Sequence, residues 1–261
     1  VYLEPLAILM SKLTGQPVKM VMSREEVFRA TGPGPGSHTR IKMGVTKEGQ
    51  ITAVDCNIWM EAGGFPGSAF GAAMKAIIAP YAVENFQIIG SDVLVNKPKS
   101  AAYRAPGAPN AAHASECIID ELAEQLRIDP LEFRLKNAAI KGSKTVDGGP
   151  SPEIGMVETV QTAQEHPHYT APLGPNQGRG VASGFLINAP GEATAHISIM
   201  PDGRASLVTG RPDIGGSRVA HAMVLAEELD IEVNDIRPSI GDTDSIGFNG
   251  MTGGSSTGYS A

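Results

Sequence analysis

One stretch of this chain surrounds a single guanidinium with small residues. Arg104 is the only charged residue between positions 100 and 115, and Ala, Pro and Gly dominate its surroundings. A helical pattern follows over residues 113–126. Small residues let a ligand approach the backbone, the first helical amides point outward without partners, and an Arg can grip an oxyanion with two parallel hydrogen bonds. The pattern indicates an anion-binding loop; the simpler alternative is a Pro-punctuated turn whose Arg is solvated or caps a neighbouring helix.

Further motifs lie on both sides of this loop. They occupy residues 15–19 and 23–26, residues 120–123 and 129–137, and residues 210–216, 226–229, 241–244 and 252–255. Each motif is weak alone, but their order and spacing along nearly the whole chain are fairly specific. Together they resemble the molybdenum-binding subunit of the xanthine dehydrogenase and aldehyde oxidase family, which includes the large subunits of carbon monoxide dehydrogenase-like enzymes.

The resemblance implies that the chain forms part of a cradle for a molybdenum–molybdopterin cofactor. In the family the pterin carries a phosphate or a dinucleotide tail, the cytosine dinucleotide form included. Such a cradle needs backbone donors and an Arg, with little side-chain bulk. Each glycine is explained more simply by the geometry of a turn. A cofactor-binding role would add only that the exposed amide of the glycine faces the ligand. The cofactor-binding positions that fit are Arg104, Gly107, Gly215, Gly216, Gly253, Gly254 and Ser255.

The resemblance also implies an oxidative hydroxylation in which a metal-bound hydroxyl attacks an electrophilic carbon, hydride passes to a metal sulfido group, and a glutamate acts as base. In the family a Gly-Gly-Phe-Gly-Gly-Lys type loop lies just ahead of the residue that matches Val1. The base glutamate follows the region that matches Ala261. Both ends of the chain look cut from something longer. We therefore assign no catalytic residue and expect the chain alone to be inactive.

Three departures from the family pattern bear on a usual side-chain contact and on the substrate. Gly216 replaces a Gln that many relatives carry, and Pro106 replaces an aromatic residue of xanthine-oxidising relatives. Residues 101–107 lack the copper-binding Cys of true carbon monoxide dehydrogenases. Gly216 removes one usual side-chain contact, Pro106 argues against stacking a purine, and the missing Cys argues against CO oxidation. Aldehydes or N-heterocycles, oxidised with water-derived oxygen, stay as the leading substrates.

Two other functions stay open. A non-catalytic scaffold or binding module could retain the same fold, and Gly216 and Pro106 lean that way. A phosphosugar or nucleotide enzyme could use similar anion-binding loops. That second alternative is disfavoured because no loop matches GxxxxGK[ST], or GxGxxG at a strand–helix junction.

Composition limits the partners. The net charge of −7 gives no support for nucleic-acid binding. Cys56 and Cys117 form no CxxC motif, so we predict no metal site in this chain and read both thiols as buried. With no signal peptide and no apolar run of about 18 residues, we expect no membrane contact and a cytoplasmic location. The resemblance places iron–sulfur clusters and FAD on partner subunits, in a homo-oligomer of heterotrimers that acts on a small molecule.

Hydrophobic periodicity predicts an α+β fold with mixed β-sheets and packed helices, and the resemblance implies two molybdopterin-binding-type subdomains. We place a first partial domain at residues 1–145, a linker with one helix at 146–178, and a second partial domain at 179–261. No internal repeat at a fixed period is evident. The predicted helices cover residues 3–13, 72–78, 113–126, 129–137, 152–165 and 217–229, with a brief helix after a capping box of Ser23 and Glu26 and with Gly15 ending the first helix. The predicted strands cover 18–22, 40–46, 50–60, 86–95, 181–187, 193–200, 205–209 and 233–240, and turns at 47–49 and 201–204 join hairpins.

Side-chain placements follow from the same patterns. Trp59 is expected in the core of a hairpin sheet. Acidic residues of the long helix, namely Glu116, Asp120, Glu121 and Glu124, are read as a solvated face. In the helix over residues 217–229, we expect Val219, Met223 and Ala226 to point inward.

Overall fold

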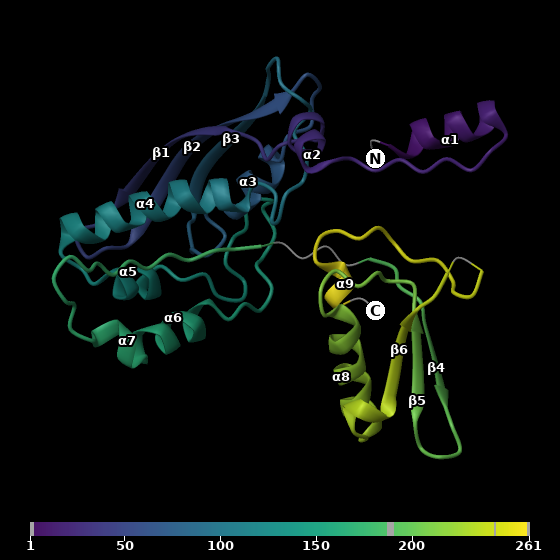
Figure 1. The fold of residues 1–261 in the computed structure, drawn as a ribbon. Coiled ribbons are helices and arrows are strands. Elements are labelled where there is room, and N and C mark those ends of the chain that lie inside the picture. Colours follow the sequence, from purple (N-terminus) through teal and green to yellow (C-terminus); the bar gives the residue numbers. More distant parts are fainter. Residues whose placement is uncertain (1–2, 187–190, 243, 260–261) are drawn as a thin grey trace. The chain divides into compact units, whose positions relative to one another are not determined.

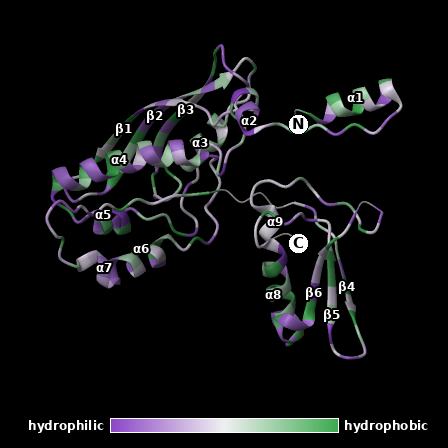
Figure 2. Ribbon diagram, viewed as in Figure 1, coloured by the Kyte–Doolittle hydropathy of each residue, from purple (hydrophilic) through white to green (hydrophobic). Residues whose placement is uncertain are grey.

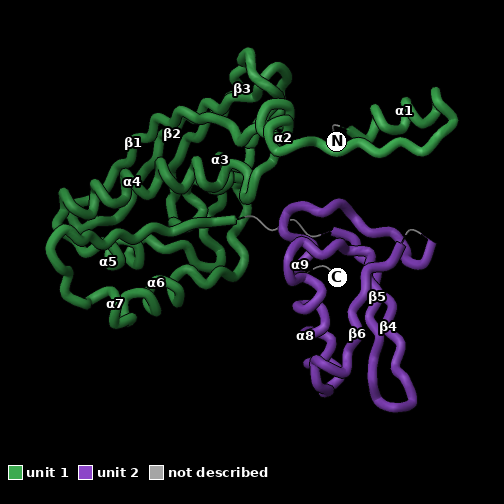
Figure 3. The backbone as a smooth tube through the Cα atoms, viewed as in Figure 1, with its two compact units in different colours: residues 1–186 green, residues 187–261 purple. Residues whose placement is uncertain are grey.

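The computed structural model describes residues 3–186, 191–242 and 244–259 of the chain. It contains two compact units, residues 1–186 and residues 187–261 (Figures 1 and 3). Each unit holds one mixed three-stranded sheet with helices packed against it, which confirms the predicted α+β class. The segment over residues 146–178, predicted as a linker with a helix, lies within the first unit.

The first sheet combines a hairpin with a helical crossover. Strands β1 (Ser37–Val45) and β2 (Ile51–Gly63) pair antiparallel around the predicted turn. Helix α3 (Phe70–Ala76) then returns the chain so that β3 (Asn85–Leu94) pairs parallel with β2. A helix is the usual connection between parallel neighbours, because a tight turn cannot reverse the chain twice.

Only one face of this sheet is buried. Alternate residues of β2, including Cys56, Ile58 and Met60, lie in the core beneath α3 and α4 (Ala108–Leu126). Trp59 points to the opposite face, where it is 37% exposed and its ring lies 5.5 Å from that of His38. The prediction that Trp59 fills the core was therefore wrong, because the period of two along a strand places it opposite its buried neighbours.

Helix α4 begins earlier than predicted and carries a buried acid. Its first residues follow Gly107, whose φ of +81° ends the preceding loop. Glu116 is buried rather than solvated, because the guanidinium of Arg134 donates to its carboxylate at 2.8 and 2.9 Å. The Tyr81 hydroxyl also donates to Glu116, and its pKa is raised by burial and by that carboxylate. Cys56 is buried as expected, but Cys117 on α4 is exposed.

Arg134 belongs to helix α5 (Pro130–Lys136). The chain that follows α5 covers the buried ion pair of Arg134 and Glu116. Helices α6 (Met156–Glu165) and α7 (Pro167–Thr170) lead to an extended segment over residues 180–186. This segment accepts a hydrogen bond from Arg134 at the Val181 carbonyl and donates one to Glu116 from the Ser183 amide. It joins no sheet, so the predicted strand over residues 181–186 was wrong; residue 187 lies outside the described residues.

The N-terminal segment follows local signals closely. Helix α1 (Glu4–Thr14) ends at Gly15 as predicted, and α2 (Arg24–Ala30) starts with the predicted capping box between Ser23 and Glu26. Residues 18–22 form no strand, because no other strand pairs with them. Figure 2 shows hydrophobic residues along α1, and Leu6, Ile8, Leu9, Met10 and Leu13 are exposed there.

The second unit repeats the strand order of the first. Strands β4 (Ala195–Ile199) and β5 (Ala205–Thr209) form the predicted antiparallel hairpin. Helix α8 (Ser217–Leu229) matches its predicted bounds and leads through a short 3-10 turn, η1 (Val233–Asp235), to β6 (Ile236–Ile240), which is parallel to β5. Helix α9 (Ser256–Tyr259) follows.

Helix α8 turns a different face inward than predicted. Ala226 is buried as expected, together with Ala222 and Leu225, but Val219 and Met223 are 57% and 56% exposed. At about 100° per residue, positions 219 and 223 lie nearly opposite position 221, which faces the protein. Among the described residues, no helix is long and apolar enough to cross a membrane.

Candidate functional site

The Arg104 loop lies at the edge of the first sheet where the two parallel strands end. The loops that follow β2 and β3 meet there, since the amide of Gly64 donates to Lys97 O at 3.1 Å. The loop before β1 joins them, because the Ala101 amide donates to Pro33 O at 3.0 Å. Ligands of open α/β sheets commonly bind beyond the carboxyl ends of parallel strands, so this edge is the first place to look for a site.

Two glycines fix the backbone of this loop cluster by close approach. A Cβ atom on Gly63 would lie 2.2 Å from Pro98 O, and one on Gly107 would lie 2.5 Å from Ala69 O. Neither distance can be accommodated without moving backbone. Gly107 is also buried. The atom nearest to its added Cβ belongs to Ala69, the residue that precedes α3. The predicted cofactor-binding loop is thereby packed closely against its neighbours.

Arg104 is the cation of this cluster that remains available. Lys97 pairs with the Glu61 carboxylate at 2.7 Å, and the Lys99 ammonium donates to Gly67 O at 2.7 Å. Arg104 is exposed and makes no hydrogen bond or ion pair with any residue that the structure describes. An exposed guanidinium on a fixed loop, with its donors unused, is suited to bind an oxyanion from solution.

The neighbouring loop over residues 64–69 already binds an anion, the Asp92 carboxylate of β3. Asp92 accepts hydrogen bonds from the amides of Gly67 at 2.5 Å and Ser68 at 2.9 Å, and from the Ser68 hydroxyl. Burial raises the pKa of Asp92, but these donors outweigh it and leave the pKa below its usual range. The Gly67 and Ser68 amides are therefore already used and are not free for a further ligand. The unpaired positive charge lies on the Arg104 loop.

The second unit places its two Gly-rich loops at the equivalent edge, after β5 and β6. Gly215 and Gly216 have φ values of +112° and +90° and precede the first turn of α8. Asp213 accepts from the amides of Gly215 at 3.0 Å and Ser217 at 3.1 Å. Hydrogen bonds, first from Arg218 and then from Gly215, lower the pKa of Asp213 to about 2. Within the described residues, the Gly216 amide has no partner and remains open to a ligand.

The predicted residues Gly253, Gly254 and Ser255 form the turn that precedes α9. Gly253 O accepts from the amide of Ser256 at 3.1 Å and from its hydroxyl at 2.8 Å. Gly254 and Ser255 are exposed, with φ values of +59° and +62°. A left-handed conformation is uncommon for a residue with a side chain, so Ser255 holds a strained position that its surroundings must maintain.

The residue that organises this turn is Arg211, which the sequence analysis did not single out. Arg211 is 1% exposed, and its Nη1 donates to Gly250 O at 3.1 Å, Met251 O at 3.1 Å and Ser256 Oγ at 3.2 Å. Its Nη2 donates to Glu192 O at 2.7 Å. The available signal was a cation in a Gly- and Pro-rich segment that leads into a helix, as at Arg104.

Three buried polar atoms near these loops have no partner in the described residues: Arg211 Nε, His221 Nδ1 and Thr257 Oγ1. The other ring nitrogen of His221 lies 2.7 Å from Thr257 O, which ties α8 to α9. Buried polar atoms normally find a protein or water partner. The second unit therefore retains hydrogen-bonding capacity beside its predicted loops.

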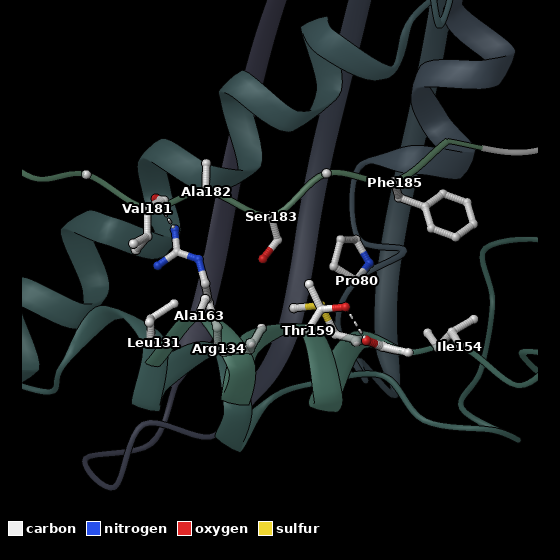
Figure 4. Close-up of a pocket in the computed structure, with 15 residues that line it drawn as sticks. Pro80, Leu131, Arg134, Ile154, Thr159, Ala163, Val181, Ala182, Ser183 and Phe185 are labelled. Carbon is white, nitrogen blue, oxygen red and sulfur yellow. Dashed lines mark hydrogen bonds between the residues drawn. The ribbon is translucent and has the colours of Figure 1, made fainter. Parts of the chain in front are cut away.

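The first unit also contains a cavity of about 550 Å³ that none of the predicted residues lines. Figure 4 shows it between α5, α6 and residues 180–185, with Leu131, Ile154 and Phe185 around it. Arg134 reaches its wall, but every nitrogen of that guanidinium already donates within the protein. This cavity lacks an available acid, base or cation, so we do not place the site there.

Comparison with known proteins identifies the class of these two units. Residues 1–138 match a molybdopterin cofactor-binding domain, and residues 158–261 match a second domain of that description. The chain belongs to the molybdopterin cofactor-binding domain family.

Its relatives are considerably longer. The chain is 28% identical over 264 residues to the aldehyde oxidoreductase molybdenum-binding subunit PaoC of Escherichia coli O157:H7, covering 95% of this chain and 35% of that protein. It is 31% identical over 156 residues to the nicotinate dehydrogenase large molybdopterin subunit of Eubacterium barkeri, covering 58% of this chain and 37% of that protein. The chain thus spans about a third of these relatives.

Solved structures agree on the fold. The aldehyde oxidoreductase from Desulfovibrio desulfuricans ATCC 27774 superposes with a TM-score of 0.79 at 24% identity, covering 94% of this chain and 29% of that chain. At this level of identity the likeness establishes the arrangement of elements alone.

Proposed function

We propose that this chain is the cofactor-binding part of a molybdenum hydroxylase large subunit that oxidises an aldehyde or an N-heterocycle. The observation that carries the proposal is the unpaired Arg104 guanidinium, exposed on a loop that Gly63 and Gly107 fix in place. Family membership supplies the class of ligand, and the names of the relatives support oxidoreductase chemistry.

The residues present fit a molybdopterin with an anionic tail. A phosphate needs a cation or amide donors; the first unit offers the Arg104 guanidinium, and the second unit, taken by itself, offers the open Gly216 amide. When bound, such a cofactor supplies the two-electron oxidation of a substrate carbon. In this proposal Arg104 binds an anionic group, Gly107 holds the Arg104 loop, and Arg211 shapes the second loop cluster. The proposed cofactor-binding positions remain Arg104, Gly107, Gly215, Gly216, Gly253, Gly254 and Ser255; Gly107 is buried, so its part is to hold the loop.

The remaining assignments belong to the same proposal. They are a cytosine dinucleotide form of the pterin, iron–sulfur and FAD partner subunits in a homo-oligomer of heterotrimers, and a cytoplasmic location. The domain limits at 1–145, 146–178 and 179–261 also stay predictions. A "large molybdopterin subunit" among the relatives supports the presence of partner subunits. We assign no catalytic residue to this chain, and we expect the chain alone to lack turnover.

The test compares two exposed arginines in the complete subunit purified from its own source. Arg104→Ala should sharply lower molybdenum and pterin content, measured by elemental analysis and by fluorescence of the released pterin. Arg204→Ala is the matched control, because Arg204 is exposed and pairs locally with Asp202 at 2.8 Å in a hairpin turn. Equal and small effects of the two substitutions would remove the cofactor role of Arg104. A folded wild-type subunit without molybdenum and pterin would favour a scaffold.

A further inference from the structure

Helix α4 carries a histidine and a cysteine that lie close together on its surface. His113 and Cys117 are four residues apart, both are exposed, and Cys117 Sγ lies 3.9 Å from His113 Nδ1. Residues four apart on a helix lie one above the other on the same face. Neither residue belongs to the loops described above.

We propose that His113 and Cys117 form a two-ligand surface site for a borderline-soft divalent cation such as Zn²⁺. Thiolate sulfur and imidazole nitrogen are the preferred ligands of that class of metal. With Zn–S of about 2.3 Å, Zn–N of about 2.0–2.1 Å and tetrahedral angles, the two ligand atoms must lie about 3.6 Å apart. The observed 3.9 Å is close to that separation, so a small side-chain rotation suffices.

The surroundings leave room for the rest of a coordination shell. A groove of about 480 Å³ runs between α4 and the edge strand β1, and both His113 and Cys117 line it. Glu121, one turn beyond Cys117, also lines the groove and adds negative charge, whereas Arg40 adds positive charge. In the described part of the chain, no three His, Cys, Asp or Glu side chains are grouped for a metal. Water therefore completes the shell.

The other cysteine does not compete for the metal. Cys56 is 0% exposed, and burial, with a smaller effect of Asp55, raises the pKa of its thiol to about 11. A thiol must lose its proton to bind a metal, so Cys56 is neither accessible nor ionised near neutral pH. Cys117 is the accessible thiol among the described residues, and metal binding there should strengthen as pH rises.

The experiment titrates the 261-residue chain with Co²⁺, whose complexes with thiolate absorb in the near ultraviolet, and then displaces it with Zn²⁺. We expect one Co²⁺ per chain with a thiolate charge-transfer band. Cys117→Ser and His113→Gln should each weaken Zn²⁺ binding by at least about tenfold. The matched control His196→Gln changes an exposed histidine on β4 and should have no effect.

A thiol-labelling measurement provides a second readout. Bound Zn²⁺ should slow the reaction of Cys117 with a thiol reagent in the wild type, and much less in the His113→Gln variant. All the substituted side chains are exposed, so far-ultraviolet circular dichroism should report an unchanged fold. The proposal is overturned if no thiolate band forms, or if His113→Gln binds Zn²⁺ as tightly as the wild type does.

Discussion

The two units have the same arrangement of strands, but one arginine in a Gly- and Pro-rich loop of each unit differs in its surroundings: Arg104 is exposed and Arg211 is buried. In each unit an antiparallel hairpin is followed by a helix and a parallel third strand, and Gly-rich loops follow the parallel strands. Arg104 in the first unit is exposed and unpaired within the described residues. Arg211 in the second is buried and donates to four protein acceptors. An Arg in a Gly- and Pro-rich loop can thus recognise a ligand or hold the loop, and its partners decide which.

The largest expected effect tests this contrast directly. Arg211→Leu should destabilise the second unit by about 3 kcal/mol or more, because it removes all four hydrogen bonds that the buried guanidinium donates to residues 192, 250, 251 and 256. Denaturant unfolding of the chain, with amide exchange of residues 250–258, measures the change. Arg104→Ala is the control and should alter stability by no more than about 0.5 kcal/mol. Similar losses for both variants would contradict the assignment of opposite roles.

A second comparison concerns two glycines that each precede a helix. Gly107→Ala should cost about 2–4 kcal/mol, because the new Cβ meets backbone atoms in addition to the strain of a positive φ. Gly216→Ala should cost only about 1–2 kcal/mol, since its Cβ meets nothing within 4 Å and the strain remains. Thermal unfolding of the two variants ranks them. A larger loss of stability for Gly216→Ala than for Gly107→Ala would contradict the idea that the close packing of Gly107 against the start of α3 fixes the Arg104 loop.

The smallest expected effect concerns the acid that holds the α8 loop. The pKa of Asp213 is lowered to about 2, chiefly by Arg218, against about 3.9 for an unfolded chain. A lowered folded pKa means that the stabilising contribution is present above about pH 4 and is lost as pH falls through about 2. Carboxyl NMR titration should give that low value, and Arg218→Ala should raise it. An unchanged value in the Arg218→Ala variant would assign the shift to the amides of Gly215 and Ser217 and to the Ser217 hydroxyl.

Local signals in the sequence predicted most of the elements. Helix α8 has its predicted bounds, since glycine permits the positive φ before Ser217 and an apolar pattern continues to Leu229. The errors arose where a distant partner decides the outcome. Residues 18–22 read as a strand but have none to pair with, and Glu116 is buried because Arg134, eighteen residues away, neutralises it. The prediction that Trp59 lies in the core was wrong for a related reason, because the sequence does not reveal which face of a sheet the helices cover.

Part of the candidate site could also be predicted from local signals in the sequence. The sequence marked Arg104 through its isolation in a small-residue loop, and the structure leaves its guanidinium exposed. It could not separate Gly107, which is packed against the start of α3, from Gly216, whose surroundings are open. That distinction depends on the approach of another segment. Arg211 was missed because three of its four acceptors are backbone carbonyls, which every residue possesses.

The close approach of Gly107 to the start of α3 has a consequence for recognition. A loop that must order its backbone on binding loses about 1–2 kcal/mol of conformational free energy for each residue fixed. The backbone around Arg104 is already fixed by contacts at both ends, through Gly63 with Pro98 and Gly107 with Ala69. Only the long Arg104 side chain needs to be ordered, at about 2 kcal/mol. The anion site proposed at Arg104 would therefore need to order one side chain and little backbone.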